Sequence, residues 1–202
     1  MATEGYKNLI SRVAPFLKER GFSKRADCFQ FERAGNWGVI DFQKSRKSNA
    51  GEVIFTINLG VCSGSLLEFF RPGVLVQKPK IEDCHWRERV GFFLPEKTDK
   101  WWRISDRVLS DNFIHEIVSC LGACVIPEII SHISDENLCA EWMQGKSPGL
   151  TKIQRLINLS VLLKKLNKGE DLTNVIREME VLSAGASTEL LVKGHIRNLE
   201  SI

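Results

Sequence analysis

The chain has 202 residues, a formal net charge of +3, 26% charged residues and 43% hydrophobic residues. This balance is typical of a soluble globular protein and excludes a disordered or collagen-like chain. The small net charge does not favour a nucleic-acid-binding protein, which usually concentrates a larger excess of Lys and Arg on one face. The length is sufficient for one domain, or for a domain with a smaller helical extension.

The start of the chain and its cysteines bear on the compartment. Met1 to Glu4 begin a polar, helix-like segment without the apolar stretch of a secretory leader, so we expect no leader. The six cysteines are then expected to be reduced thiols in the cytoplasm. The longest apolar region, Ile117 to Ile130, contains Pro127 and Glu128 and is too short to cross a bilayer. No transmembrane segment is therefore expected.

The first predicted element is a helix that ends near Arg20, just before Gly21. Its apolar positions recur at helical spacing: Tyr6, Leu9, Ile10, Val13 and Leu17. Three strands are predicted next, over residues 28–33, 37–46 and 52–62, and the turns between them contain Gly and Asn. Such short connections favour an antiparallel meander, because parallel strands need a crossover of a dozen residues or more.

The strand over residues 52–62 has the clearest pattern of the three. Alternate residues from Val53 to Val61 are apolar and predict a side that faces the core. The other side is largely polar, and so is one side of the strand before it. These polar positions are Asp41, Gln43 and Ser45 on the first of the two strands and Thr56, Asn58 and Gly60 on the second. One sheet face is therefore expected to be core, and the other is a candidate binding surface.

The pattern is weaker between residues 63 and 104. Residues 63–80 are predicted as a loop with a helical turn at 66–70, and residues 85–93 and 101–104 as one or two further strands. Beyond Ser105 the pattern is helical. We expect helices over residues 106–131, bent or ended near Pro127, and over 136–143. Further helices are predicted over residues 151–167, 171–182 and 187–200.

These elements predict an α+β fold: an antiparallel meander sheet of about five strands packed by helices, with an all-helical C-terminal third. Gly145–Gly149 is rich in helix breakers and is the best linker candidate. We therefore expect a sheet domain over residues 1–145 and a helical extension over residues 150–202. The extension either docks on the first domain or offers its surface to a partner.

Five segments of the chain carry a resemblance to a known family. They are Gly21–Lys24, Val39–Ser45, Phe55–Val61, Trp86–Gly91 and Trp101–Trp102, in that order. Over roughly residues 6–133 the chain resembles an uncharacterised, mainly bacterial family, domain of unknown function four-three-zero-four. The resemblance implies an α+β domain. It supplies no catalytic residues, because no activity is established for the family.

The polar sheet face is the first candidate site. Asp41, Gln43 and Asn58 place donors and acceptors on neighbouring strands, and Arg87 and Arg89 can approach from a later strand. Arginine side chains bind planar anions through two hydrogen bonds, so the face suits a carboxylate, a phosphate or a peptide edge. The alternative is a solvated face, which is common in antiparallel sheets.

Trp101 and Trp102 are the second candidate. Adjacent residues of a strand point to opposite faces, so we expect one tryptophan in the core and the other at the surface. The exposed one is a candidate anchor for a partner, since Trp and Arg are enriched in binding hot spots. Simple packing is the alternative reading.

Other residue groups can be explained by ordinary structural roles. Lys44–Lys47 and Lys78–Lys80 fit charged turns as well as phosphate contacts. No zinc-type cysteine pair occurs, and the motif His115–Glu116 lacks the second histidine of a zinc protease, so neither a metal nor a cofactor is predicted. Asp111 lies four residues before His115 and can pair with it on one helical turn.

No catalytic set emerges from the sequence. We favour a non-catalytic, cytoplasmic binding or regulatory module that engages a protein partner through the polar sheet face and its flanking Trp and Arg residues. The alternative is a small hydrolase or transferase that acts on an anionic substrate in a pocket formed by Asp41, Asn58, Arg87, Arg89 and Cys62. A nucleic-acid binder is the third possibility, and it requires a continuous basic face.

Overall fold

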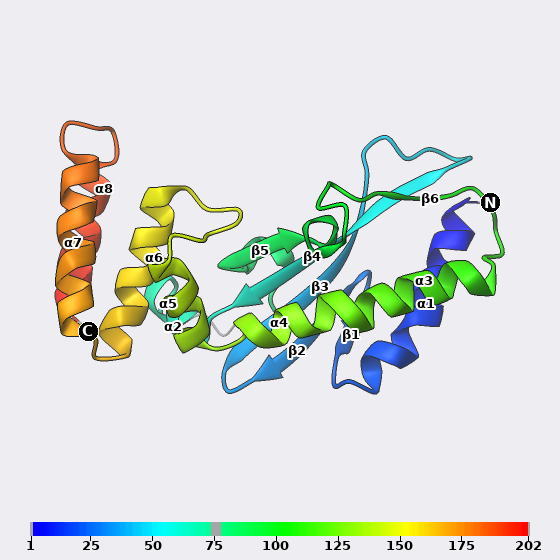
Figure 1. Cartoon of the computed structure of the whole chain (residues 1–202), viewed down its shortest axis with the longest axis horizontal. Helices are drawn as coiled ribbons and strands as arrows, with labels where there is room; N and C mark the ends of the chain where they lie inside the picture. The colour runs from blue at the N-terminus through cyan, green and yellow to red at the C-terminus, as the bar shows by residue number, and fades with distance from the viewer. Residues whose placement is uncertain (1, 74–77, 202) are drawn as a thin grey trace.

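A computed structural model describes residues 2–73 and 78–201. Residues 74–77, which belong to the segment predicted as a loop, lie outside the described residues. The molecule is elongated, and a sheet occupies its middle (Figure 1). Helix α1 (Ala2–Lys18) lies at one end of the long axis, and α8 (Glu189–Glu200) lies at the other.

The sheet is antiparallel and has six strands. They are β1 (Ser23–Arg25), β2 (Cys28–Arg33), β3 (Asn36–Lys44), β4 (Val53–Cys62), β5 (Trp86–Arg89) and β6 (Trp102–Ile104). The order is β1-β2-β3-β4-β5, and β6 pairs with the other end of β4. The α+β meander predicted from the sequence is therefore confirmed. Strand β1 was not predicted, because its residues Ser23, Lys24 and Arg25 are all polar and show no alternating pattern.

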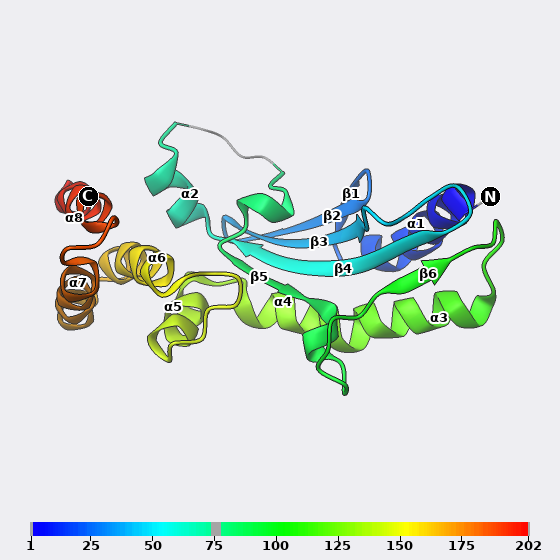
Figure 2. The same cartoon turned by 90° about the horizontal axis from the view of Figure 1, so that it is seen from above.

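Three helical segments pack on one face of the sheet. Helices α3 (Asp111–Cys120) and α4 (Ile126–His132) run along this face (Figure 2), and the buried side of α1 joins the same core. The Tyr6 ring packs edge-on against Phe55 at 5.7 Å, and its hydroxyl donates a hydrogen bond of 2.6 Å to the carbonyl oxygen of Phe42. Apolar burial between this sheet face and the helices supplies the main driving force for the fold.

The helix over residues 111–132 is continuous, so of the predicted bend or end near Pro127 the end is wrong. A π-helical turn, η3 (Leu121–Val125), comes just before this proline, which cannot donate a regular helical hydrogen bond. By length and composition alone the helix is able to cross a membrane. Here Ile117, Leu121 and Val125 are fully buried in the core. The absence of a membrane segment stays a prediction.

The C-terminal third is helical, as predicted. It comprises α5 (Asp135–Met143), α6 (Lys152–Lys165), α7 (Gly169–Ser183) and α8. The Lys165 ammonium lies 3.3 Å from the Glu68 carboxylate of α2 (Gly64–Phe70), and the Ser160 hydroxyl lies 2.8 Å from His195 Nε2. Leu159 and Leu162 belong to the same hydrophobic cluster as the sheet residues. The division into two domains stays a prediction.

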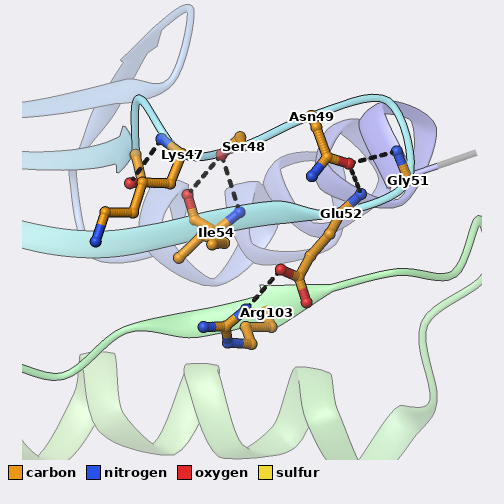
Figure 3. A network of polar contacts seen from close by, with 8 residues as sticks. Lys47, Ser48, Asn49, Gly51, Glu52, Ile54 and Arg103 are labelled. Carbon is orange, nitrogen blue, oxygen red and sulfur yellow. Dashed lines mark hydrogen bonds and ion pairs between the residues drawn. The ribbon is translucent and has the colours of Figure 1, made fainter.

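The turn between β3 and β4 fixes how these strands align (Figure 3). The side-chain oxygen of Asn49 accepts hydrogen bonds from the backbone of Gly51 at 2.8 Å and of Glu52 at 3.0 Å. The Glu52 carboxylate in turn lies 2.6 Å from the Arg103 guanidinium on β6. A slip of one residue would turn every side chain of the strand to the other face, so these contacts help to keep the polar positions of both strands on one side.

Candidate functional site

Two rows of residues cross the sheet on the face opposite α3 and α4. In the open row, the register partners across β2 to β5 are Cys28, Asp41, Asn58 and Arg89. In the covered row, they are Gln30, Val39, Gly60 and Arg87. Register partners of an antiparallel sheet point to the same side. Arg87 and Arg89 therefore join the polar face, as the sequence predicted.

The middle of the covered row lies beneath a short helix, η1 (Ile81–Asp83), and the residue after it. Gly60 makes this close approach possible, because a Cβ atom there would lie 2.6 Å from Cys84 Sγ and 2.7 Å from Ile81 Cδ1. Val39, Cys62 and Cys84 are buried together in a small apolar cluster. This part of the face is therefore closed to a ligand.

The middle of the open row lies in a pocket of about 560 Å³, which we call the polar pocket. Five predicted site residues line it, together with Glu82, Glu88 and Phe92: Asp41, Gln43, Asn58, Arg87 and Arg89. Its volume is within the usual range for ligand sites. The structure thus brings together in one depression five of the residues that the sequence assigned to this face. Thr56 is fully buried and donates a hydrogen bond of 2.8 Å to the Lys100 carbonyl oxygen, so it does not take part.

Asn58 organises the floor of the polar pocket. Its side-chain nitrogen donates hydrogen bonds of 3.1 Å to the Asp41 carboxylate and 2.9 Å to the Gln43 side-chain oxygen. Burial raises the pKa of Asp41, and nearby Glu82 adds to the rise, whereas the Asn58 hydrogen bond opposes it. Burial likewise raises the pKa of Glu88. Both carboxyl groups therefore hold a proton more readily than they would in water.

The two arginines of the polar pocket differ in their partners. The Arg89 guanidinium lies 2.6 Å from the Asp99 carboxylate, which also accepts a hydrogen bond of 2.9 Å from the Trp101 indole. Arg89 also lies over the Trp101 ring, 5.2 Å from its centroid. Arg87 is half-buried and has no ion pair or side-chain hydrogen bond with any residue in 2–73 or 78–201. It is the guanidinium that remains available to an anion.

The two tryptophans have separate positions, as their alternation predicted. Trp101 is half-buried and lies beside Arg89. Trp102 is only 5% exposed, stacks on Phe55 at 5.5 Å and donates a hydrogen bond of 2.8 Å to Glu116. Trp102 is therefore a core residue and does not reach the polar pocket.

Several other candidates are not brought together. Cys62 lies in the apolar cluster, where burial raises the pKa of its thiol to about 12 and the thiol donates to the Asp83 carbonyl oxygen at 3.2 Å. It is therefore not a nucleophile of the polar pocket. Asp111 pairs with Arg12 at 2.5 Å, whereas His115 lies 3.4 Å from Ser119. Within the described ranges, no group of three or more metal-binding side chains is arranged to hold an ion.

A second pocket of about 560 Å³ lies at β5 and shares Glu88 and Phe92 with the polar pocket. Nothing in the sequence pattern predicted it. His132 stacks on Trp86 here, with ring centroids 4.1 Å apart, and forms an ion pair with Glu141. These partners are distant in sequence, and a lone histidine on a helix shows no pattern. Sequence reasoning therefore could not find them.

The surroundings of His132 argue against catalysis. Ser131 Oγ lies 2.9 Å from His132 Nδ1, and Glu141 faces the other ring nitrogen, as in a nucleophile and base pair. Nδ1 also lies 2.7 Å from the Glu128 carbonyl oxygen, a contact that requires a proton on Nδ1. Burial lowers the pKa of His132, but the contacts with Glu141 and Glu128 outweigh it and raise the pKa overall. With its proton on Nδ1, His132 has no lone pair there to accept the proton of Ser131, so it cannot activate the serine in this arrangement.

The chain was compared with known proteins and families. A family model described as "Domain of unknown function (DUF4304)" matches residues 13–127, which is more than half of the chain. No curated protein and no solved structure matches the chain. The strands that carry the polar pocket lie inside the matched segment, and α5 to α8 lie beyond it. The match agrees with the resemblance seen in the sequence and assigns no activity.

Proposed function

The chain belongs to the family Domain of unknown function (DUF4304), and we propose that it is a non-catalytic binding module that engages a segment of a partner protein in the polar pocket. The observation that carries this proposal is the convergence of Asp41, Asn58 and Arg87 from three neighbouring strands in one open depression. A cytoplasmic, bacterial setting is part of the proposal, and the six free thiols support it.

The chemistry of the polar pocket favours a peptide segment over a simple anion. Its lining holds carboxylates from Asp41, Glu82 and Glu88 alongside the two arginines, so a purely anionic ligand would meet repulsion as well as attraction. A peptide offers both donors and acceptors to such a surface. Trp101 next to Arg89 adds an aromatic anchor of the kind that is enriched in protein interfaces.

The test compares proteins captured from a lysate of the organism that produces the chain. The baits are the wild type, the charge reversals Arg87→Glu and Asp41→Lys, and the control Arg107→Glu, an exposed residue outside the polar pocket. We expect a protein that the wild type and the control retain and that both pocket variants retain at least about tenfold less. Identical captures by all four baits would contradict the proposal.

The second candidate function is a hydrolase or transferase that acts on a small anionic substrate. Asp41, whose pKa is raised by burial, lines the same pocket as Arg87, which has no ion pair among the described residues. This combination suits a general acid beside an anion-binding group. The test is a panel of phosphate and carboxylate esters. Turnover that disappears in the variant Asp41→Asn and survives in Arg107→Glu would favour this function over the first.

A further inference from the structure

The polar pocket continues into a smaller side pocket of about 250 Å³, and the two have opposite chemistry at their far ends. They share Asp41, Ile81 and Glu82, so they adjoin each other. The side pocket extends to Gln30 on β2, whereas the polar pocket extends to Arg87 on β5. Gln30 and Arg87 are the two ends of the covered row.

The Gln30 end lacks a hydrogen-bond donor. Gln30 is 1% exposed, and its side-chain nitrogen donates to Cys28 Sγ at 3.2 Å. Its side-chain oxygen is buried and has no hydrogen-bond partner among the described residues. Buried polar atoms are rarely left unpaired. The side pocket is lined by three carboxylates, those of Asp27, Asp41 and Glu82, and by two cations, Arg25 and Lys80, so the carboxylates outnumber the cations. This end therefore suits a positively charged donor such as an ammonium group.

The Arg87 end lacks an acceptor. Arg87 is half-buried and unpaired within the part of the chain that the structure describes, whereas Asp99 already neutralises Arg89. A guanidinium that is partly withdrawn from water and faces a pocket favours a carboxylate, which it can bind with two parallel hydrogen bonds. This end therefore suits an anionic group.

The spacing of the strands sets the distance between the two groups of the ligand. Neighbouring strands lie about 4.8 Å apart, so β3 and β5 are separated by about 10 Å and β2 and β5 by about 14 Å. An extended chain advances about 3.4 Å per residue. A ligand whose carboxylate and lysine are two residues apart therefore spans, together with the length of the lysine side chain, the separation between Arg87 and the acceptors near Asp41 and Gln30.

We propose that the two pockets together bind the free carboxy terminus of a partner protein, with its terminal carboxylate on Arg87 and a lysine two residues earlier between Gln30 and Asp41. This rests on the proposed function, and it names the part of the partner that enters the site. Charge complementarity selects this occupant: an internal segment without Asp or Glu has no carboxylate for Arg87, and a terminus without a cationic side chain leaves the Gln30 oxygen without a donor and Asp41 without an opposite charge.

The test measures binding of short peptides by amide chemical shifts of the ¹⁵N-labelled full chain. The parent probe is acetyl-Ala-Ala-Lys-Ala-Ala with a free carboxylate. One modified probe ends in an amide, and the other has norleucine in place of lysine. We expect each modification to weaken binding about tenfold, because each removes a hydrogen-bonded charge. The shifts should centre on β3, β4 and β5.

Protein variants assign each peptide group to its residue. The variant Arg87→Gln should bind the amidated probe as well as the parent probe, because the charge that pairs with the terminal carboxylate is already missing. For the same reason, norleucine in place of lysine should weaken binding to Asp41→Asn less than binding to the wild type. The matched control Arg107→Gln should behave as the wild type. Modified probes that bind as well as the parent, or penalties that persist in the matching variants, would overturn the inference.

Failure of this inference can be told apart from failure of the proposed function. If none of the three peptides binds while lysate capture still depends on Arg87 and Asp41, the carboxy-terminal assignment is wrong and the binding module stands. If capture is also indifferent to these two residues, both are wrong.

Discussion

Two neighbouring rows on one sheet face have opposite surroundings. The covered row is sealed at Val39 and Gly60, where Cys84 packs directly against the strand, whereas the open row exposes Asp41 and Asn58 to a pocket. The strands and their twist are the same, so the backbone does not decide the difference. The difference comes from side chains two residues apart in the same strand. Gly60 has no side chain, so Cys84 packs directly above it, whereas the Asn58 amide hydrogen-bonds to the Asp41 carboxylate and lines the pocket. The covered row serves stability, and the open row is available for binding.

The largest expected effect comes from filling the space above Gly60. The variant Gly60→Val would place its Cβ 2.6 Å from Cys84 Sγ, so η1 and Cys84 must move away from the sheet. We expect a loss of about 1–3 kcal/mol in the free energy of unfolding, measured by urea denaturation. The control Gly194→Ala adds a Cβ in α8 with nothing within 4 Å and should stabilise by about 0.5–1 kcal/mol. If Gly60→Val is as stable as the wild type, η1 and Cys84 are only loosely packed on the sheet.

Acid should weaken the same region by a smaller amount. His85 Nδ1 accepts a hydrogen bond of 3.1 Å from the Ser63 backbone, and burial is the main cause that lowers the pKa of His85 to about 4. An unfolded histidine has a pKa of about 6.5, so between these values only the unfolded state binds the proton. Stability should therefore fall by about 1–2 kcal/mol per such histidine between pH 7 and pH 5.

The variant His85→Gln isolates this contribution in urea titrations at the two pH values. Its free energy of unfolding should depend less on pH than that of the wild type. The contribution of His195 should remain, because burial also lowers the pKa of that residue to about 4. The matched control His115→Gln changes an exposed histidine on α3, away from the Ser63 backbone. If His85→Gln loses as much stability in acid as the wild type, His85 does not stabilise the packing of η1 and Cys84 on the sheet.

The smallest effect is expected in the open row, with the opposite sign. Burial raises the pKa of Asp41, so its ionised form disfavours folding, and the stability present at low pH is lost as the pH rises through the folded-state pKa. At pH 7 the variant Asp41→Asn should therefore be as stable as the wild type or more stable by up to about 1 kcal/mol in urea. The exposed control Asp106→Asn should change nothing. A clear loss of stability in Asp41→Asn would make Asp41 a structural residue.

Local patterns were enough to place the polar face. Alternation along the strands set Asp41, Gln43 and Asn58 on one side, and the same rule separated Trp101 from Trp102. Helical spacing likewise located the C-terminal helices within a few residues of their bounds. These features depend on neighbours in the sequence, which is why they could be predicted.

Contacts between distant segments could not be read in this way. Ile81 and Glu82, which line the polar pocket, come from η1, far along the chain from the strands of its floor, and Asp99 pairs with Arg89. The pairing of His132 with Trp86 joins α4 to β5. Such partners show no periodic pattern in the sequence, because only tertiary packing brings them together.

The most direct test of the binding module places a photoreactive residue at Gln43, an exposed position of the polar pocket, and another at Glu19, an exposed position near the end of α1. Each protein is irradiated in a lysate of the organism that produces the chain, and heavier adducts are compared. We expect a discrete protein adduct from Gln43 and none from Glu19. No adduct from Gln43, or equal adducts from both positions, would contradict it.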